Sequence, residues 1–358
     1  MTVSSAISSI TRGPRETNME LLRLLAMWFV LTVHADFVAL GAAPHAWSGL
    51  HEGLSSVMRT FVEMGAVVGV NVFVLISGWF GIRPTVRGVV NFLYQVIFIG
   101  LLCFVVYSLL TQSFRTDYFL SVFCLKESLW FVKAYLGLYL IVPLLNLYCK
   151  HAGERQLRYT IVLFYIYQTV YGFLGNNVTV SNGYTVFSFI GLYLLARYMR
   201  LHYRGERHRA WLGIYLLTAV LNTFAYYFCP EDQIITSYAN PLVVIGALGL
   251  MMYFTRLEIK HDPRINWVAA SAFAVYVFHF SGPVFPYYLD MTRQAYEAWT
   301  GLWAILAVAM VMAGYFIVAV VIDQLRVFTW RRVGPVMISF FERSFTALAS
   351  RTALKKHR

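Results

Sequence analysis

Apolar stretches of about 20 residues recur along the whole chain, and each is long enough to cross a bilayer as a helix. Only 13% of the 358 residues are charged and 59% are hydrophobic, whereas charged residues make up about 25% of soluble globular proteins. We therefore predict an all-α, polytopic integral membrane helix bundle. The ten candidate transmembrane helices are residues 20–40, 62–81, 88–111, 128–148, 157–175, 184–199, 210–229, 236–255, 265–288 and 301–322.

Basic residues set the expected orientation of the bundle. If both termini are cytoplasmic, only four of the 29 Lys and Arg residues lie outside, as the positive-inside rule requires. This distribution accounts for the net charge of +12 without nucleic acid and suits anionic membrane lipids. We expect a cytoplasmic tail at 1–19, a membrane domain at 20–325 and a basic cytoplasmic tail at 326–358 with an interfacial helix.

The first candidate helix carries Arg23 and His34 with ten residues between them. Eleven helical steps of about 100° place both side chains on one stripe, about 16 Å apart along the axis. Ionisable residues inside an apolar span are costly and mark functional sites. Arg23 alone could snorkel to the inner surface, and His34 alone could serve as an interhelical hydrogen-bonding group. We favour a functional His34, and we expect Glu20 to pair with Arg23.

The first stretch also resembles a cleaved signal peptide, because basic residues precede it and small residues follow it. Arg23 and the His34–Asp36 pair would be unusual in the core of a signal peptide. We therefore expect the first helix to be retained.

A second histidine, His279, ends the run Ser271-Ala-Phe-Ala-Val-Tyr-Val-Phe-His in the ninth candidate helix. Both helices should ascend from the cytoplasm, so His279 and His34 are expected at a similar depth. Two histidines at one level suit a proton relay, an acid/base pair or a metal site. A metal is the weakest of these because no carboxylate or cysteine set has ligand spacing, so we predict no metal.

Other polar residues lie near the helix ends. Arg83 and Arg87 follow the second helix in a short inner loop, where they fit either a topology signal or a phosphate clamp. A polar pocket is expected in the outer half of the bundle, formed by Glu63, Asn71, Lys133, His34 and His279. Further candidates for contact with substrate are Glu20, Glu127 and Trp130. Cys124 and Cys229 both fall on the outer side, where a disulfide could form.

Together these residues resemble the acyltransferase 3 family of bacterial membrane proteins. The Arg23–His34 spacing matches the arginine and histidine of the family's first helix. Three further blocks match in order, and the similarity covers most of 18–325: Asn71-Val-Phe-Val-Leu-Ile-Ser-Gly, Leu129-Trp-Phe-Val with Tyr139 and Pro143, and Ser271 … Val275-Tyr-Val-Phe-His279. The chain departs from the family at Pro84, which separates the two loop arginines, and at Glu127-Ser128, where a histidine is usual.

The resemblance implies transfer of an acyl group, usually acetyl from cytoplasmic acetyl-CoA, to a hydroxyl of a surface polysaccharide or lipid-linked sugar. It implies a bacterial cytoplasmic (inner) membrane, no permanently bound cofactor and partners in cell-envelope biosynthesis. The CoA phosphates would meet Arg23, Arg83 and Arg87 at the inner face. His34 would act as general base or as a transient acyl carrier. His279 or Lys133 would stabilise the oxyanion or bind the acceptor.

Two other functions compete with this interpretation. A proton-coupled transporter could use His34 and His279 as a relay, but the sequence shows neither paired broken helices nor an internal repeat. A scaffold protein would keep its function when Arg23 and His34 are replaced.

Overall fold

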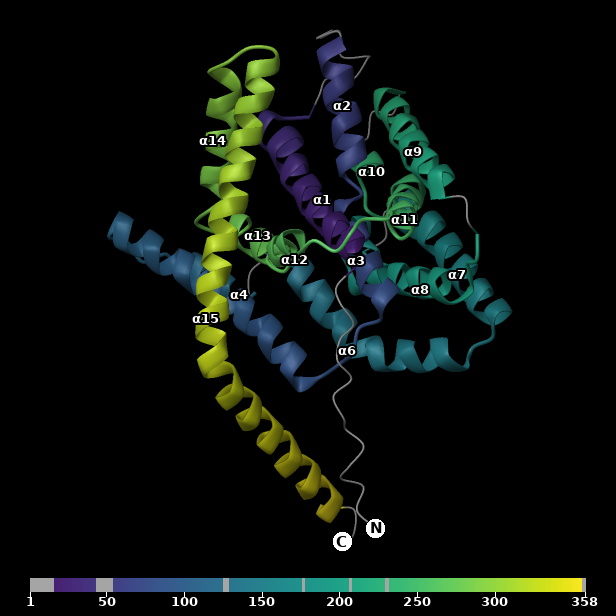
Figure 1. Ribbon diagram of the computed structural model, residues 1–358, viewed down its shortest axis with the longest axis vertical. Coiled ribbons are helices and arrows are strands. Elements are labelled where there is room, and N and C mark those ends of the chain that lie inside the picture. Colours follow the sequence, from purple (N-terminus) through teal and green to yellow (C-terminus); the bar gives the residue numbers. More distant parts are fainter. Residues whose placement is uncertain are drawn as a thin grey trace.

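The computed structural model describes residues 16–42, 54–124, 129–175, 178–205, 208–228 and 232–355 (Figure 1). Every regular element in these ranges is helical, which confirms the all-α prediction. Within these described ranges, six helical stretches are long and apolar enough to cross a bilayer: Thr17–Leu40, Ser56–Phe80, Val86–Thr111, Trp130–His151, Arg209–Phe228 and Leu302–Ser344. The protein is thus a multi-pass membrane protein, while its ten crossings and the cytoplasmic placement of its termini stay predictions.

Three of the remaining predicted spans are helical, with boundaries that differ from the predicted ones. Residues 157–175 form α7 (Glu154–Tyr167) followed by a π-helical turn (Gln168–Leu174). The stretch 184–199 becomes α8 (Val186–His202), and 236–255 becomes α11 (Pro241–Phe254). Asn240 caps α11 by accepting a hydrogen bond from the Leu242 amide, which starts this helix five residues later than predicted.

The prediction of one helix over 265–288 is wrong. This region contains α12 (Pro263–Ala269), α13 (Ala272–His279) and the beginning of α14 (Phe285–Glu297). The second predicted span is also divided, into α2 (Leu54–Ala66) and α3 (Gly69–Phe80).

The first helix lies at the centre of the bundle. It consists of α1 (Thr17–Val33) and a π-helical continuation (His34–Leu40), and α1 packs against α2, α3, α12 and α13. Figure 1 shows α14 and α15 on one side of it and α2, α9 and α11 on the other. The other helices are α4 (Val86–Thr111), α5 (Thr116–Val122), α6 (Trp130–His151), α9 (His208–Phe228), α10 (Asp232–Ile235) and α15 (Leu302–Lys355).

Helices α3 and α8 approach closely at Gly78. A methyl group at this position would lie 2.8 Å from both the Tyr193 carbonyl oxygen and the Ala196 side chain. The absence of a side chain at Gly78 therefore allows the close packing of these two helices.

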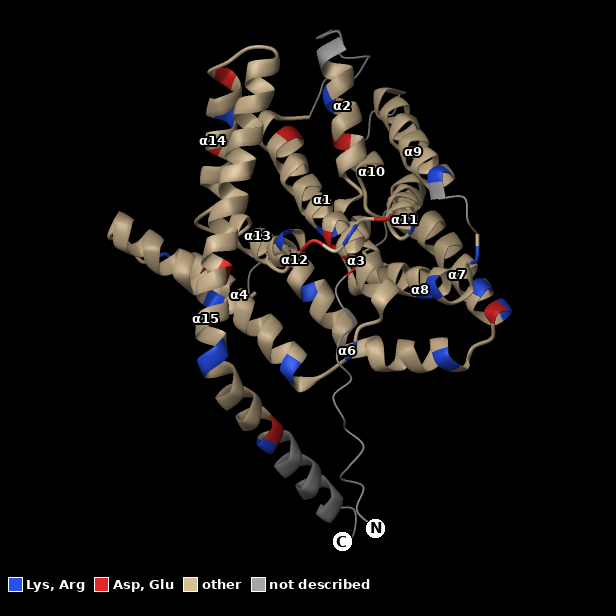
Figure 2. Ribbon diagram, in the orientation of Figure 1, with Lys and Arg blue, Asp and Glu red and all other residues tan. Residues whose placement is uncertain are grey.

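The expected interfacial helix after residue 325 is not a separate element. Helix α15 runs unbroken from Leu302 to Lys355 and contains Pro335. Figure 2 shows Lys and Arg on its lower part, at the beginning of α4 and at the end of α6. Cys124 is a free thiol, and its candidate partner Cys229 lies outside the described residues.

A buried carboxylate joins three parts of the bundle. Asp323 on α15 is 1% exposed and accepts hydrogen bonds from Gln95 on α4 and from Ser271 before α13, both at 2.9 Å. It also pairs with Arg326, whose Nε and Nη2 donate to its two oxygens at 2.9 and 3.1 Å. Arg326 donates in addition to Asn91 at 3.2 Å. A buried charge with this many partners is stabilising only while the set is complete.

We expect the Asp323→Ala protein to lose about 3–5 kcal/mol of stability, because the substitution leaves the Arg326 charge buried and unpaired. Thermal unfolding in detergent micelles should show a clearly lower midpoint. The matched control is Asp290→Ala, which removes an exposed ion pair with Arg293 (3.5 Å) and should cost at most about 1 kcal/mol. Equal midpoints for the two variants would contradict the structural role of Asp323.

Candidate active site

His34 and His279 meet at the end of α1. The Nδ1 atom of His34 lies 2.9 Å from Nε2 of His279, and the ring centroids are 5.1 Å apart. The prediction that the two histidines reach the same level of the bundle is confirmed by this contact. Because α1 is regular from Thr17 to Val33, the predicted alignment of Arg23 with His34 also holds. At His34 the backbone changes to a π-helix, a feature frequent at functional sites.

The hydrogen-bond network assigns the protons of the neutral rings. Nδ1 of His279 lies 3.0 Å from the Val275 carbonyl oxygen, which can only accept, so this nitrogen carries the proton. Nε2 of His279 is then an acceptor, and His34 must donate to it through Nδ1. This assignment leaves the second nitrogen of His34, Nε2, with a basic lone pair.

Aromatic side chains hold the His34 ring in place. Phe280 stacks on it at 5.3 Å, and Phe285 contacts it edge-on at the same centroid distance. His279 is fully buried, whereas His34 is partly exposed, so of the two rings only His34 can be reached from outside. Tyr288 packs against His279 at 5.7 Å and donates to the Leu31 carbonyl at 2.8 Å.

The Ser271–His279 motif has a structural explanation for each polar member. Ser271 donates to Asp323 on α15 and fixes the break before α13. The Tyr276 hydroxyl accepts from the Phe131 amide at 3.3 Å and ties α13 to α6. His279, the last residue of α13, reaches His34. These three contacts therefore tie α13 to α15, to α6 and to the end of α1.

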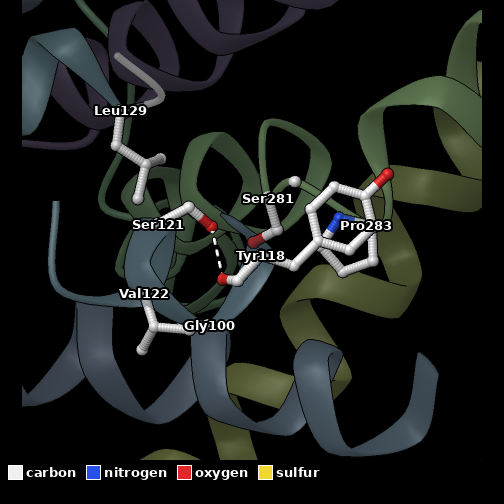
Figure 3. A pocket seen from close by; sticks show the side chains of 8 residues that line it. Gly100, Tyr118, Ser121, Val122, Leu129, Ser281 and Pro283 are labelled. Carbon is white, nitrogen blue, oxygen red and sulfur yellow. Dashed lines mark hydrogen bonds between the residues drawn. The ribbon is translucent and has the colours of Figure 1, made fainter. Parts of the chain in front are cut away.

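A small cavity lies two residues beyond His279, between α4, α5 and the turn at Ser281–Pro283 (Figure 3). Ser121 donates to the Tyr118 carbonyl at 2.6 Å in its wall. The volume of about 10 Å³ is close to the minimum for a single water molecule. This cavity is too small for an acyl donor or acceptor.

The predicted pair of Glu20 and Arg23 forms at the beginning of α1. The Arg23 Nη1 atom lies 2.6 Å from Glu20 Oε2, and the two side chains are 27% and 7% exposed. The ion pair compensates much of the Glu20 charge, while part of the Arg23 side chain stays exposed.

Of the residues predicted for substrate contact, Asn71 and Trp130 come together at Tyr238, and Glu127 falls outside the described residues. Trp130 contacts Tyr184 at 4.4 Å and stacks on Tyr238 at 5.7 Å. Asn71 donates to the Tyr238 carbonyl at 3.0 Å. Lys133 is exposed on α6, one turn from Trp130.

Glu63 lies on α2, one turn after Arg59, which forms an ion pair with Asp36. Within the described part of the chain, Oε2 of Glu63 and Oδ1 of Asn71 are buried and have no hydrogen-bond partner. Buried oxygens of this kind favour a ligand that brings hydrogen-bond donors.

The two loop arginines are separated by the structure. Arg83 lines a pocket of about 630 Å³ at the ends of α3, α6 and α8. Arg87 is exposed in the first turn of α4 and is not among the residues lining that pocket. Across the described ranges, no group of three or more His, Cys, Asp or Glu side chains is placed to hold a metal ion.

A family model described as an acyltransferase domain, acyltransferase 3, matches residues 16–323. The chain belongs to the acyltransferase 3 family. This acyltransferase 3 domain begins one residue before α1 and ends at Asp323, so both histidines and their supporting contacts fall inside it. No curated protein and no solved structure matches the chain. The resemblance found in the sequence is confirmed, and the protein is a membrane acyltransferase.

Sequence reasoning missed the roles of Asp323, Arg326 and Tyr238. The first two carried a signal, because an Asp and an Arg three residues apart on an apolar helix face are expected to pair. Tyr238 gave none, since its carbonyl and ring meet Asn71 and Trp130 only after α3, α6 and the turn before α11 have packed.

Proposed function

We propose that this protein is an O-acyltransferase that moves an acetyl or other acyl group from cytoplasmic acyl-CoA to a hydroxyl of a cell-surface polysaccharide or lipid-linked sugar. Its place would be the cytoplasmic membrane of a bacterium, beside other proteins of cell-envelope biosynthesis. Family membership supports the acyl transfer. The observation that carries the chemistry is the 2.9 Å contact between His34 and His279.

His34 acts as the general base. Its Nε2 lone pair takes the proton of the acceptor hydroxyl while the hydroxyl oxygen attacks the thioester carbonyl carbon. The tetrahedral intermediate then expels the CoA thiolate, which takes the proton back from His34. The new ester bond forms, the thioester bond breaks, and the enzyme ends in its starting protonation state.

His279 is a positioning residue in this mechanism. It holds the His34 proton on Nδ1 through its own bond to the Val275 carbonyl. When His34 is protonated on Nε2 it becomes a cation, so its bond to His279 becomes charge-assisted and stronger. This strengthening occurs along the reaction coordinate, which is where an interaction accelerates a step.

The donor phosphates would lie at the inner ends of the helices, near Arg23 and Arg83, with Arg87 further away. Arg23 lies about 16 Å from His34 along the helix axis, a separation that the pantetheine arm of CoA would bridge. An arginine there suits phosphate because its planar donors bind two oxygens at once.

The acceptor would lie in the region of Trp130, Tyr184 and Tyr238. Aromatic rings offer apolar faces for the C–H groups of a sugar. The buried oxygens of Glu63 and Asn71 would accept hydrogen bonds from its hydroxyls. Lys133, and Glu127 in the connection before α6, are further candidates for contact with this acceptor.

The test is release of free thiol from acetyl-CoA by the purified protein in lipid, with pooled cell-envelope glycans as acceptors. We expect the wild type to release thiol and the His34→Ala protein to lose at least about a hundredfold in rate, since general acid–base catalysis contributes 10²–10⁴. The control is His261→Ala, an exposed histidine in the turn before α12. Counterflow of a solute without thiol release would instead indicate the transporter.

The role of His279 is tested by His279→Leu and His279→Gln. Leucine removes the acceptor for His34 Nδ1 and should lower kcat about a hundredfold, with little change in the KM for acetyl-CoA. Glutamine offers a carbonyl acceptor and should recover part of this loss. A purely structural role predicts parallel losses of activity and thermal stability in both variants. A kcat within twofold of wild type for the leucine variant would refute the assignment.

A further inference from the structure

A pocket of about 630 Å³ lies where the ends of α3, α6 and α8 come together. Its volume falls within the range of about 300–1,000 Å³ that is typical of small-molecule sites. Phe80 and Arg83 line the pocket at the end of α3, and Lys150 lines it at the end of α6. Arg197 and His202 line it from α8. The three helices reach it from distant parts of the sequence.

The lining of this pocket is strongly basic. Arg83, Lys150 and Arg197 carry permanent positive charges, and the pocket is lined by no Asp or Glu of the described residues. Glu154 lies near the rim, 3.9 Å from His202, with a side chain that is 56% exposed. Three cations without a carboxylate among them repel one another, so the arrangement favours a bound anion.

Arg197 supplies a second observation that points to an anionic ligand. Its Nε atom is buried and has no hydrogen-bond partner among the described residues. Buried guanidinium donors in proteins are normally paired with an acceptor. A phosphate oxygen in the pocket would supply that acceptor.

The loop that carries Arg83 is fixed in place before any ligand arrives. Asn146 donates to the Ile82 carbonyl at 3.0 Å and accepts from the Tyr193 hydroxyl at 2.6 Å. Tyr139 donates to the Arg83 carbonyl at 3.1 Å. Gly81 has a φ of +75°, and a side chain here would lie 3.1 Å from the Arg197 guanidinium. A site that is rigid in advance loses less entropy when it binds.

We infer that this pocket binds the phosphate groups of the acyl donor's nucleotide, the adenosine bisphosphate part of acyl-CoA. This inference rests on the proposed function and names the site that would hold its donor. Arg197 and Lys150, which the sequence did not indicate, join Arg83 in the phosphate contacts, while Arg87 does not take part. A lipid headgroup presents the same phosphate chemistry, so the experiment must separate these two sources.

The probe is adenosine 3′,5′-bisphosphate, which has no thioester and therefore reports binding without chemistry. We expect saturable binding to the protein in nanodiscs made only of phosphatidylcholine. Arg197→Gln and Lys150→Gln should each weaken it at least tenfold. Lys150 is exposed, so its substitution leaves the fold intact even if Arg197→Gln does not. The matched control Arg155→Gln changes an exposed arginine that rests on Tyr159, and binding should stay within twofold of wild type.

Three outcomes would overturn the inference. These are no binding of the bisphosphate, binding that neither Gln substitution weakens, and retention of phosphatidylglycerol by wild type but not by the two variants without any nucleotide binding. The last outcome would assign the pocket to a lipid headgroup. The His34→Ala protein should bind the bisphosphate as wild type does, so failure of the chemistry and failure of this pocket are observed separately.

Discussion

The buried carboxylate of Asp323 is the contact on which the site depends. By accepting from Ser271 it holds the break between α12 and α13, and by accepting from Gln95 it holds α15 against α4. Helix α13 has only eight residues, so its direction is determined by how its beginning is fixed. His279 stands at its other end. The 2.9 Å contact with His34 is therefore set by a charge more than 40 residues further along the chain.

The two histidines are not equivalent, although the sequence presents them alike. His279 is fully buried and bonded on both nitrogens, to Val275 and to His34. His34 is partly exposed and lies where the α-helix becomes a π-helix. In the proposed mechanism, this difference in exposure assigns orientation to His279 and proton transfer to His34.

Features that depend on a single helix could be predicted from the sequence. The alignment of Arg23 with His34 and the pairing of Glu20 with Arg23 follow from helix periodicity alone, and both hold. The meeting of His34 with His279 needed one further assumption, that both helices ascend from the same side. The expected boundary of the family match near 18–325 also agrees with residues 16–323.

Features that depend on packing between helices could not be predicted from the sequence. The break before α13 is stabilised by a hydrogen bond from Ser271 to Asp323, and the local sequence of 265–288 gives no sign of it. The separation of Arg83 from Arg87 depends on where α6 and α8 end, because these ends form the rest of the basic pocket. Proximity in sequence therefore grouped two arginines that the fold assigns to different surroundings.

Helix α15 has a mechanical consequence that follows from its length. Its 54 residues would extend about 80 Å, and Asp323 lies near its middle. Pro335, twelve residues beyond Asp323, has no amide hydrogen to donate, so the helix bends there at lower cost than elsewhere. Bending at Pro335 would therefore move the C-terminal part of α15 without displacing Asp323, the residue that fixes the start of α13.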